Sequence, residues 1–377
     1  MPAPLASIEV NGFRSIKSLT LELSTKVTLL IGANGAGKSN LVDAFELLGY
    51  TVDRKLGAHV LRSGGFSQMI HRSFADDPTD WVAVKVWGDW NGPFRNGYRM
   101  QLTAGPEDIA LLSETTYTHN QRYPEPYDHA LGFGRESRLS EGEAARHPAN
   151  VYLLEVLSGC RVFHFDDTST DAPPLRRSDS SDSETLQSDA RNLASVLLDM
   201  KLNHTEKYEQ IRRSVRNVAP FFDDFVLREE TGSVLLRWSE RGLDGVFSGA
   251  ALSSGTLRFI CLAVLLQQPR PPATIVLDEP ELGLHPAAIH QLADLMRSVG
   301  TSQRIVAATQ SVTLLGQFSL EEVVVVERES GSTTVRRPDR ELLTAWLADY
   351  SVGELWEMNL LGGRPGGSTL PSDRVPQ

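Results

Sequence analysis

Eight residues near the N-terminus, Gly32-Ala33-Asn34-Gly35-Ala36-Gly37-Lys38-Ser39, fit the pattern G-x-x-x-x-G-K-[ST] without a mismatch. The run just before them, Lys26-Val27-Thr28-Leu29-Leu30-Ile31, predicts a buried strand. The residues just after them, 40–48, carry apolar side chains at helical spacing. The loop therefore lies between a strand and a helix N-terminus, where glycine-rich backbone and the helix dipole together attract an anion.

The chemistry of this loop predicts a nucleoside triphosphate and Mg²⁺ as its ligands. Lys38 would reach the β- and γ-phosphates, and the Ser39 hydroxyl would bind the metal. The candidate ATP-binding residues are Gly32, Ala33, Asn34, Gly35, Ala36, Gly37, Lys38, Ser39 and Asn40. A glycine-rich turn without a ligand is the alternative interpretation, and the flanking strand, the helix and the Lys-Ser pair argue against it.

Composition narrows the class of protein. The 377 residues include 37 basic and 48 acidic side chains, a net charge of −11, which disfavours a general polyanion binder but leaves room for a local basic face. Two cysteines, Cys160 and Cys261, are too few for a disulfide framework, and Cys261 lies in an apolar run typical of packing. Neither a signal peptide nor a membrane-spanning run is visible, so we expect a cytoplasmic protein without a membrane partner.

Three segments differ in their patterns, and we interpret them as three parts of one α/β fold. Residues 1–87 form an N-terminal lobe with antiparallel strands before the loop. Residues 88–190 are rich in Gly, Pro, Tyr and Asn and predict an inserted lobe that ends in a polar linker at 166–190. Residues 191–377 alternate helices with strands, which favours a mostly parallel sheet covered on both faces. The elements predicted there include helices at 190–201, 205–218, 254–267 and 286–299, and strands at 225–228, 234–239, 273–277 and 304–308.

A second candidate site follows the apolar strand Thr274-Ile275-Val276-Leu277, which ends in Asp278-Glu279-Pro280. A buried parallel strand delivers its last residues to the edge of the sheet where the loop also lies. Asp278 there would bind Mg²⁺, and Glu279 would act as the general base that polarises the attacking water. A strand followed by an ordinary acidic turn is the alternative, and the phosphate-binding loop makes it the weaker one.

A family resemblance emerges upstream of this strand. The segment Leu252-Ser253-Ser254-Gly255-Thr256-Leu257-Arg258 resembles the L-S-G-G-Q signature of ABC ATPases, with departures at Ser254 and Thr256. The tract Glu281-Leu282-Gly283-Leu284-His285-Pro286 resembles the D-loop that follows D-E-P in that family. The opening Asn11-Gly12-Phe13-Arg14-Ser15 and the ending Gly353–Trp356 with Gly362–Pro365 resemble the RecF/OLD/SMC-like branch, which includes stand-alone bacterial AAA-type predicted ATPases. No useful heptad run appears, so we expect no coiled-coil arms.

The resemblance implies a P-loop NTPase fold of the ABC ATPase head type. It also implies that the signature closes on the γ-phosphate held by a second copy. Ser253 and Gly255 would then complete the site in trans, and ATP would join two protomers into a homodimer. The alternative is that Ser253 is an ordinary helix cap.

Three further positions follow from the same resemblance. Gln68 would be the glutamine that senses Mg²⁺ and water between two lobes, with a solvated loop residue as the alternative. Gln310 takes the place of a histidine that contacts the γ-phosphate; it can donate a hydrogen bond but cannot share a proton, which affects hydrolysis more than binding. Arg14 would approach the nucleotide, or else be an exposed turn residue. His285 is a neighbouring titratable group whose simpler interpretation is a surface helix start.

Together these features predict slow phosphoryl transfer from ATP to water, completed by dimer closure. Members of this branch are linked to DNA repair, OLD-type nucleases or phage defence. No Asp-x-Asp occurs after Ser311, so we expect no Toprim nuclease centre in this chain and a separate nuclease or effector as partner. The acidic charge suggests that the protein alone binds DNA weakly. The alternatives are a nucleotide-dependent scaffold, such as the toxin-regulating half of a two-protein system, and a transporter ATP-binding subunit, against which the insert and the altered signature argue.

Overall fold

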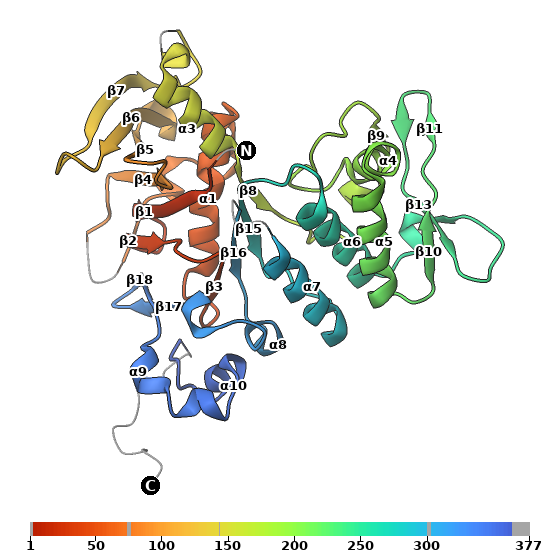
Figure 1. Ribbon diagram of the computed structural model, residues 1–377. Helices are drawn as coiled ribbons and strands as arrows, with labels where there is room; N and C mark the ends of the chain where they lie inside the picture. The colour runs from red at the N-terminus through yellow and green to blue at the C-terminus, as the bar shows by residue number, and fades with distance from the viewer. Residues whose placement is uncertain (1–2, 74–76, 143, 300–302, 364–377) are drawn as a thin grey trace.

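The computed structural model describes residues 3–73, 77–142, 144–299 and 303–363. Its centre is a six-stranded sheet in the order β18-β17-β3-β16-β15-β8 (Figure 1). Neighbours from β17 to β8 run parallel, and β18 is antiparallel at one edge. The strands are β3 (Val27–Ile31), β8 (Cys160–Phe163), β15 (Thr274–Asp278), β16 (Arg304–Ala308), β17 (Val323–Glu329) and β18 (Ser332–Arg336). The predicted, mostly parallel core sheet is therefore confirmed.

Successive side chains of these strands point to opposite faces of the sheet, so the interior consists of two hydrophobic cores. In β15, Ile275 and Leu277 belong to one core, while Val276 belongs to the other. The first core packs against α6 (Ser254–Gln267) and α7 (Pro286–Ser298), and the second against α1 (Lys38–Val52). Because both faces of the sheet are covered, its strands need apolar side chains at nearly every position.

A second six-stranded sheet, antiparallel throughout, has the order β2-β1-β4-β5-β6-β7. Its strands are β1 (Leu5–Phe13), β2 (Ile16–Glu22), β4 (Trp81–Gly88), β5 (Phe94–Ala104), β6 (Ala110–Asn120) and β7 (Tyr127–Gly134). The N-terminal antiparallel segment is confirmed. Strand β5 lies in the predicted insert, yet it pairs with β4 along its length. The boundary placed at residue 88 thus divides one sheet. Helix α1 lies between the two sheets, with α2 (Leu56–Arg62) and α3 (Pro148–Ser158) nearby (Figure 1).

On the far side of the core sheet, α4 (Leu193–Asn203) and α5 (Thr205–Val218) pack with α6 into a helical lobe (Figure 1). Short strands decorate this lobe: β9 (Ser178–Asp179), β10 (Phe222–Phe225), β11 (Glu229–Glu230), β12 (Ser233–Val234), β13 (Arg237–Glu240) and β14 (Phe247–Ser248). The strand predicted at 225–228 lies three residues earlier, as β10, and the strand predicted at 234–239 is divided between β12 and β13. Packing between distant segments of the lobe, such as Phe222 on Trp238, sets this pairing.

Residues 166–190, predicted as a linker, are attached to the helical lobe. Ser178 is buried, its hydroxyl lies 2.7 Å from that of Ser195, and its backbone pairs with Val234. These contacts within the protein replace the hydrogen bonds that a solvated linker would make with water.

The chain ends in short helices: α8 (Val312–Leu315), α9 (Arg340–Leu343) and α10 (Val352–Glu357). Among the described residues the longest helix is α1, with 15 residues, and no helix there is long and apolar enough to cross a membrane. Both cysteines are buried and unpaired, and burial raises the pKa of each thiol to about 12. Arg364 and Pro365, part of the ending quoted above, lie outside the described residues.

Candidate functional site

The glycine loop between β3 and α1 adopts the conformation that an anion cradle requires. Gly35 and Gly37 have φ values of 79° and 107°, in the left-handed region that favours glycine. Among the described residues their backbone amides have no hydrogen-bond acceptor, so they are available to a ligand. Lys38, only 6% exposed, donates from Nζ to the carbonyl oxygens of Gly32 (2.8 Å) and Ala33 (3.1 Å). Burial lowers the pKa of Lys38, and the nearby carboxylates of Glu279 and Asp278 oppose that shift.

Hydroxyl groups of residues distant in the sequence hold the loop in place through hydrogen bonds. Thr333 of β18 donates from Oγ1 to the carbonyl oxygen of Ala36 (2.8 Å), and its Oγ1 lies 2.7 Å from the hydroxyl of Ser15. Asn40 in turn donates to Ser15 (2.6 Å). A Cβ on Gly37 would come within 2.0 Å of Thr333 Oγ1. Close packing therefore requires glycine at position 37, in addition to its φ angle.

The structure brings Ser39 and Asp278 together at the candidate metal position. The Ser39 hydroxyl lies near the Asp278 carboxylate. Burial is the main cause that raises the pKa of Asp278; the Ser39 hydroxyl opposes this shift, and the charges of Glu279 and Asp43 add to it. A divalent cation would relieve this crowding of negative charge, and hydroxyl and carboxylate oxygens are ligands that Mg²⁺ accepts. The two side chains thus fit the metal that the sequence predicts.

Glu279 follows β15 in a strained conformation, with a φ of 43° that non-glycine residues rarely adopt. Its backbone N–H donates to the carbonyl oxygen of Ala308 at 2.8 Å, which fixes the turn against β16. The side-chain amide of Gln310, which follows β16, donates to the Glu279 carboxylate. Gln310 is therefore placed to orient Glu279, a contact that the sequence did not indicate.

Glu281 is a buried carboxylate that the sequence analysis treated only as part of the D-loop-like tract. It is 9% exposed and accepts hydrogen bonds at Oε1 from the Thr309 hydroxyl (2.5 Å) and the Gln310 backbone (3.3 Å). Its other oxygen, Oε2, is buried and has no hydrogen-bond partner in the part of the chain that the structure describes. Burial raises the pKa of Glu281. The extra carboxylate in D-E-P-E was the available signal, but nothing in the sequence indicated its burial.

Replacing Glu281 by Gln should stabilise the nucleotide-free protein, and increasingly so as pH rises. A carboxyl group whose pKa is raised by folding lowers stability once pH exceeds its unfolded-state pKa of about 4.3. This loss is complete above the folded-state pKa. Thermal unfolding between pH 4 and pH 8 should show a Tm gain for the variant that appears on the alkaline side. The exposed Glu229 serves as control, since Glu229→Gln should shift Tm little; a Glu281→Gln gain independent of pH would contradict the account.

The signature segment begins α6 with exposed donors. Ser253 is the N-cap residue, and its Oγ accepts from the Thr256 backbone N–H at 3.2 Å. Ser253 and Ser254 are exposed, so a second molecule could reach them. A Cβ on Gly255 would meet the carbonyl oxygen of Gly283 at 2.6 Å. The start of α6 therefore packs backbone to backbone against the D-loop-like tract. His285 caps α7 through Nδ1, which accepts from Ala287 N–H (3.3 Å), as its simpler interpretation predicted.

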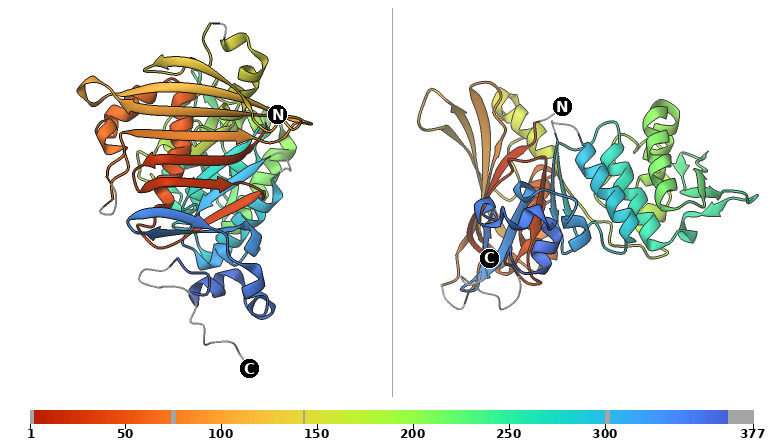
Figure 2. Two further views of the ribbon diagram at one scale, coloured as in Figure 1. Left: turned by 90° about the vertical axis from the view of Figure 1, so that its left-hand side faces the viewer. Right: turned by 60° about the horizontal axis from the view of Figure 1, so that its bottom comes forward.

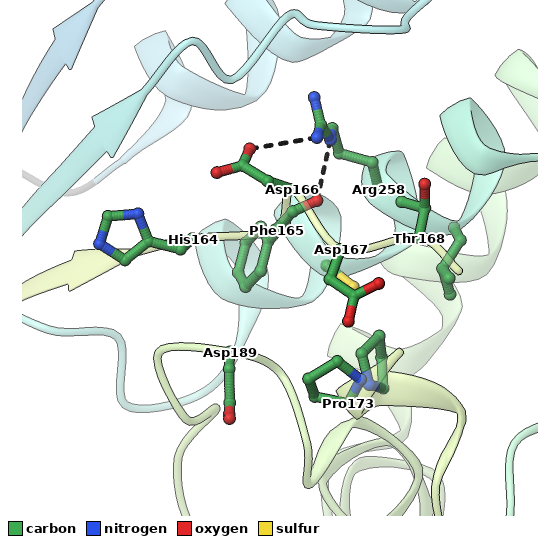
Figure 3. A pocket seen from close by; sticks show the side chains of 11 residues that line it. His164, Phe165, Asp166, Asp167, Thr168, Pro173, Asp189 and Arg258 are labelled. Atoms are coloured by element: carbon green, nitrogen blue, oxygen red, sulfur yellow. Dashed lines mark hydrogen bonds and ion pairs between the residues drawn. The ribbon is translucent and has the colours of Figure 1, made fainter. Parts of the chain in front are cut away.

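Arg258, one turn into α6, is a buried arginine that joins three segments (Figure 3). It donates to the carbonyl oxygens of Phe165 (2.9 Å) and Leu282 (2.5 Å) and to the Asp166 carboxylate (3.1 Å). Phe165, Asp166 and Arg258 also line a cavity of about 290 Å³. Because charge-assisted hydrogen bonds to buried groups are strong, Arg258 fixes the signature helix to the tract that follows Glu279.

Replacing Gly255 by Ala should destabilise the fold by about 1–3 kcal/mol, the usual cost of overpacking. The added methyl group would force α6 away from Gly283, and the backbone there cannot move aside as a side chain would. Urea denaturation would measure the change. The neighbouring Ser254→Ala is the matched control, because that side chain is exposed. Equal stability of the Gly255→Ala protein and the wild type would show that the close approach is not maintained in solution.

Arg14 lies beside the phosphate-binding loop, although it faces helix α1. Its φ is 48°, its guanidinium pairs with Asp43, and it lies 3.5 Å from Asn40 Oδ1. Gln68 ends a 3-10 turn (Phe66–Gln68), is exposed, and forms no hydrogen bond to Ser39 or Asp278. The structure thus brings Arg14 near the loop, while the role of Gln68 as a sensor of Mg²⁺ and water stays a prediction.

His164 is a residue near the site that the sequence analysis missed. It directly follows β8, whose last residue, Phe163, is paired with Leu277 of β15, so His164 lies next to Asp278. Its Nε2 lies 3.5 Å from Glu46 of α1, and this contact is the main cause that raises the pKa of His164. The chain passes here from the core sheet to the helical lobe, and only the strand pairing reveals that position.

Comparisons with known proteins agree with this geometry. The model of an AAA domain family, whose description names the AbiEii toxin of type IV toxin–antitoxin systems, matches residues 140–316, and the RecF/RecN/SMC N-terminal domain model matches residues 4–96. DNA repair protein RecN of a Synechocystis species is 37% identical over 84 residues, or 22% of this chain and 14% of that protein. DNA replication and repair protein RecF of Aliivibrio salmonicida is 33% identical over 73 residues, or 19% and 20%.

A longer match extends over most of the chain. The Old nuclease of Escherichia phage P2 is 22% identical over 401 aligned positions, which cover 89% of this chain and 61% of the nuclease. The chain therefore spans less than two thirds of the length of each of these relatives. The crystal structure of an Smc head bound to the C-winged helix domain of ScpA shares the fold, with a TM-score of 0.61 at 17% identity over 90% of this chain and 99% of that chain. The Smc head domain from Pyrococcus furiosus gives 0.57 at 16%, over 93% and 99%.

The phosphate-binding loop, the two carboxylates after β15 and the parallel sheet define a P-loop NTPase of the ABC head type. Together with the family models that match residues 4–96 and 140–316, these features support an ABC-type P-loop ATPase of the RecF/OLD/SMC branch.

Proposed function

We propose that this protein binds ATP with Mg²⁺, dimerises around the nucleotide and hydrolyses it slowly. The observation that carries the proposal is the meeting of the free amides of the glycine loop, the Ser39–Asp278 pair and Glu279 at one edge of the core sheet. P-loop ATPases of this class generally bind ATP with Mg²⁺. Positioning and charge stabilisation would therefore account for most of the rate.

Each residue has a distinct part in this proposal. The amides of residues 35–39 and the Lys38 ammonium bind the phosphates, which requires Lys38 to leave the carbonyl oxygens of Gly32 and Ala33. Ser39 and Asp278 would hold Mg²⁺, which when bound neutralises charge on the phosphates. Glu279 orients the attacking water, and the Gln310 amide holds the Glu279 carboxylate in place.

The partner copy would complete the site. Ser253 and Gly255 lie at an exposed helix start, where hydroxyl and amide donors favour a phosphate. Within one chain the phosphate-binding loop and the signature belong to different helices, α1 and α6, on opposite faces of the core sheet. This separation supports closure between two protomers, related by a two-fold axis, over closure within one chain.

Measuring molecular mass by light scattering tests the dimer. In the Glu279→Gln protein, which would retain ATP, the mass should double on addition of Mg-ATP and stay monomeric without it. The double variant with Lys38→Ala should stay monomeric in both conditions. If the molecular mass of the Glu279→Gln protein stays the same at saturating ATP, the proposal that two protomers form the site together is wrong.

The biological role that we propose is an ATP-controlled switch for a separate effector, in DNA repair or phage defence. Support comes from the relatives, whose names include a DNA repair protein, a DNA replication and repair protein and a phage nuclease. The Smc head in the matched structure is bound to a domain of ScpA, a partner protein. Co-purification with a nuclease or other effector that depends on Lys38 would support this role.

A second candidate is a nucleotide-dependent scaffold with little turnover. The observation that favours it is Gln310, which cannot share a proton and is bonded to Glu279. Equal, negligible phosphate release by the wild type and Glu279→Gln would select this candidate over the hydrolytic switch.

A further inference from the structure

The antiparallel sheet exposes one face that no helix covers (Figure 2, left). Its other face belongs to the core around α1: Val82, Val84 and Val86 of β4 point inward and are buried. Strand alternation therefore turns Lys85 and Trp87 outward. The outward side chains at one end of β4, β5 and β6, with Trp90 after β4, form what we call the outer cluster: Lys85, Trp87, Trp90, Arg95, Arg99, Tyr117 and His119.

Cations and aromatic rings interleave in this cluster. Lys85 Nζ lies 4.7 Å from the ring centroid of Tyr117 and 5.4 Å from that of Trp87. The Arg95 guanidinium lies 4.4 Å from the Trp87 ring and 4.6 Å from the Trp90 ring. A Cβ on Gly97 would come within 2.7 Å of Trp87. The indole therefore lies against the sheet over Gly97, and the rings of Tyr117 and His119 are tilted to it by 46° and 56°.

The cations of the outer cluster are not neutralised by close ion pairs. Among the described residues, neither Lys85, Arg95 nor Arg99 forms a salt bridge, and Arg99 donates only to the side-chain oxygen of Gln101 (2.8 Å). Glu9 of β1 and Asp128 of β7 lie opposite Lys85 and Tyr117 in the strand register, so acidic groups border the cluster on both sides. In a chain with a net charge of −11, such a bordered cationic strip has charge complementarity to an anionic partner.

Arg95 and His119 face each other across β5 and β6. The Arg95 guanidinium packs against the Trp87 and Trp90 rings, and its Nε has no hydrogen-bond partner among the described residues. His119 donates from Nε2 to the carbonyl oxygen of Tyr123 (3.1 Å). Exposed aromatic side chains also gather on this sheet. Among the described residues, five of the seven large aromatics that are exposed lie between β4 and the end of β7: Trp90, Phe94, Tyr123, Tyr127 and Phe133. Strand alternation turns Phe94 and Tyr127 to the face opposite the outer cluster, so Trp90 and Phe133 are the exposed rings of these strands and their ends on the outer side.

We propose that the outer cluster binds single-stranded nucleic acid. Bases would stack on Trp90 and the neighbouring rings, while Lys85, Arg95 and Arg99 contact phosphates. Interleaved aromatic and cationic side chains are the combination that unpaired bases and their backbone require. An acidic peptide would pair with the cations but would not contact the faces of the aromatic rings. In a duplex the bases stack on each other and are not available to these rings. The outer cluster shares no residue with the proposed ATP site, so binding there can be measured without nucleotide.

Fluorescence anisotropy with a labelled oligodeoxythymidine of about 20 nucleotides tests the proposal on the full chain without ATP. Trp90→Ala should weaken binding roughly 5- to 150-fold, as for loss of one stacked base, whereas Trp90→Phe should retain most of the affinity. Lys85→Ala combined with Arg99→Ala should lower the slope of log affinity against log salt by about 1.4, which corresponds to two lost phosphate contacts on a single strand. Arg213→Ala on the helical lobe is the matched control, because it removes an exposed cation elsewhere.

The variants should unfold at the wild-type Tm, which shows that they are folded. Each outcome of the binding experiment then supports or contradicts nucleic-acid binding by the outer cluster. Loss of affinity with Trp90→Ala, rescue with Trp90→Phe and an unchanged Arg213→Ala protein would establish the site. No binding of the oligonucleotide at low salt, or equal losses with Arg213→Ala, would overturn it and leave a protein partner for this face. Tighter binding of the corresponding duplex would overturn the stacking role of the aromatic rings.

Discussion

Replacing Glu279 by Gln should lower steady-state ATP turnover by about 10²–10⁴-fold, the usual contribution of a general base. ATP affinity should change little, because Lys38, Ser39 and the loop amides still hold the phosphates. The substitution keeps the shape of the side chain and an oxygen that can accept from Gln310. It removes only the charge that polarises water. Phosphate release measures turnover, and binding of a fluorescent ATP analogue measures affinity.

The neighbouring Glu281 provides the control for this experiment. Glu281→Gln also neutralises a carboxylate after β15, but Glu281 is buried and bonded to Thr309 and Gln310. We expect its turnover to stay within about tenfold of the wild type, since its carboxylate is buried and its hydrogen bonds go to Thr309 and the Gln310 backbone. Equal losses in the two variants would mean that the general electrostatics of the tract, and not Glu279 as a base, determine the rate.

Mixing two inactive variants should restore hydrolysis. Lys38→Ala disables the phosphate-binding loop of its own chain. Ser253→Asp keeps the helix cap, since aspartate caps as well as serine, but places a negative charge against the phosphate of the partner. Each variant alone should lose about 10²–10³-fold in turnover, the typical cost of removing a donor that stabilises developing charge. In a mixed dimer, one of the two composite sites combines an intact loop with an intact Ser253.

For random pairing, half of the dimers in an equal mixture are mixed and each has one working site, so the mixture should recover turnover of the order of one quarter of the wild type. Ser253→Thr is the matched control and should retain activity in the unmixed protein. Titrating the ratio of the two variants at constant total protein gives a maximum at equal amounts. If the mixture shows only the average of the two inactive proteins, the site does not form in trans.

The elements around the loop could be predicted closely from the sequence. The structure has α5 at Thr205–Val218, α6 at Ser254–Gln267 and β16 at Arg304–Ala308, as expected from their apolar periodicity. Each of these elements is decided by a local pattern of side chains and, for α6, by a serine cap. The pairing of the loop with Asp278 could also be predicted, since strands of one parallel sheet present their C-terminal ends at the same edge.

The short strands of the helical lobe and the attachment of residues 166–190 could not be predicted in this way. Their hydrogen bonds connect distant segments, such as Ser178 with Val234, and local propensity does not determine which segments meet. The same holds for β5, which the weak periodicity of residues 88–150 assigned to a separate lobe although it extends the sheet of β4.

The sequence by itself determined the ATPase class, the glycine loop and the acidic strand end, because in these places chemistry and local conformation depend on the same few adjacent residues. Only the tertiary structure decided which distant groups join them: Arg258 across the signature helix, Gln310 on Glu279, buried Glu281, and His164 beside Asp278. It also decided that the cations and rings of three strands share one uncovered face. These arrangements depend on strand register and burial, which are properties of the whole packed chain and of no single segment.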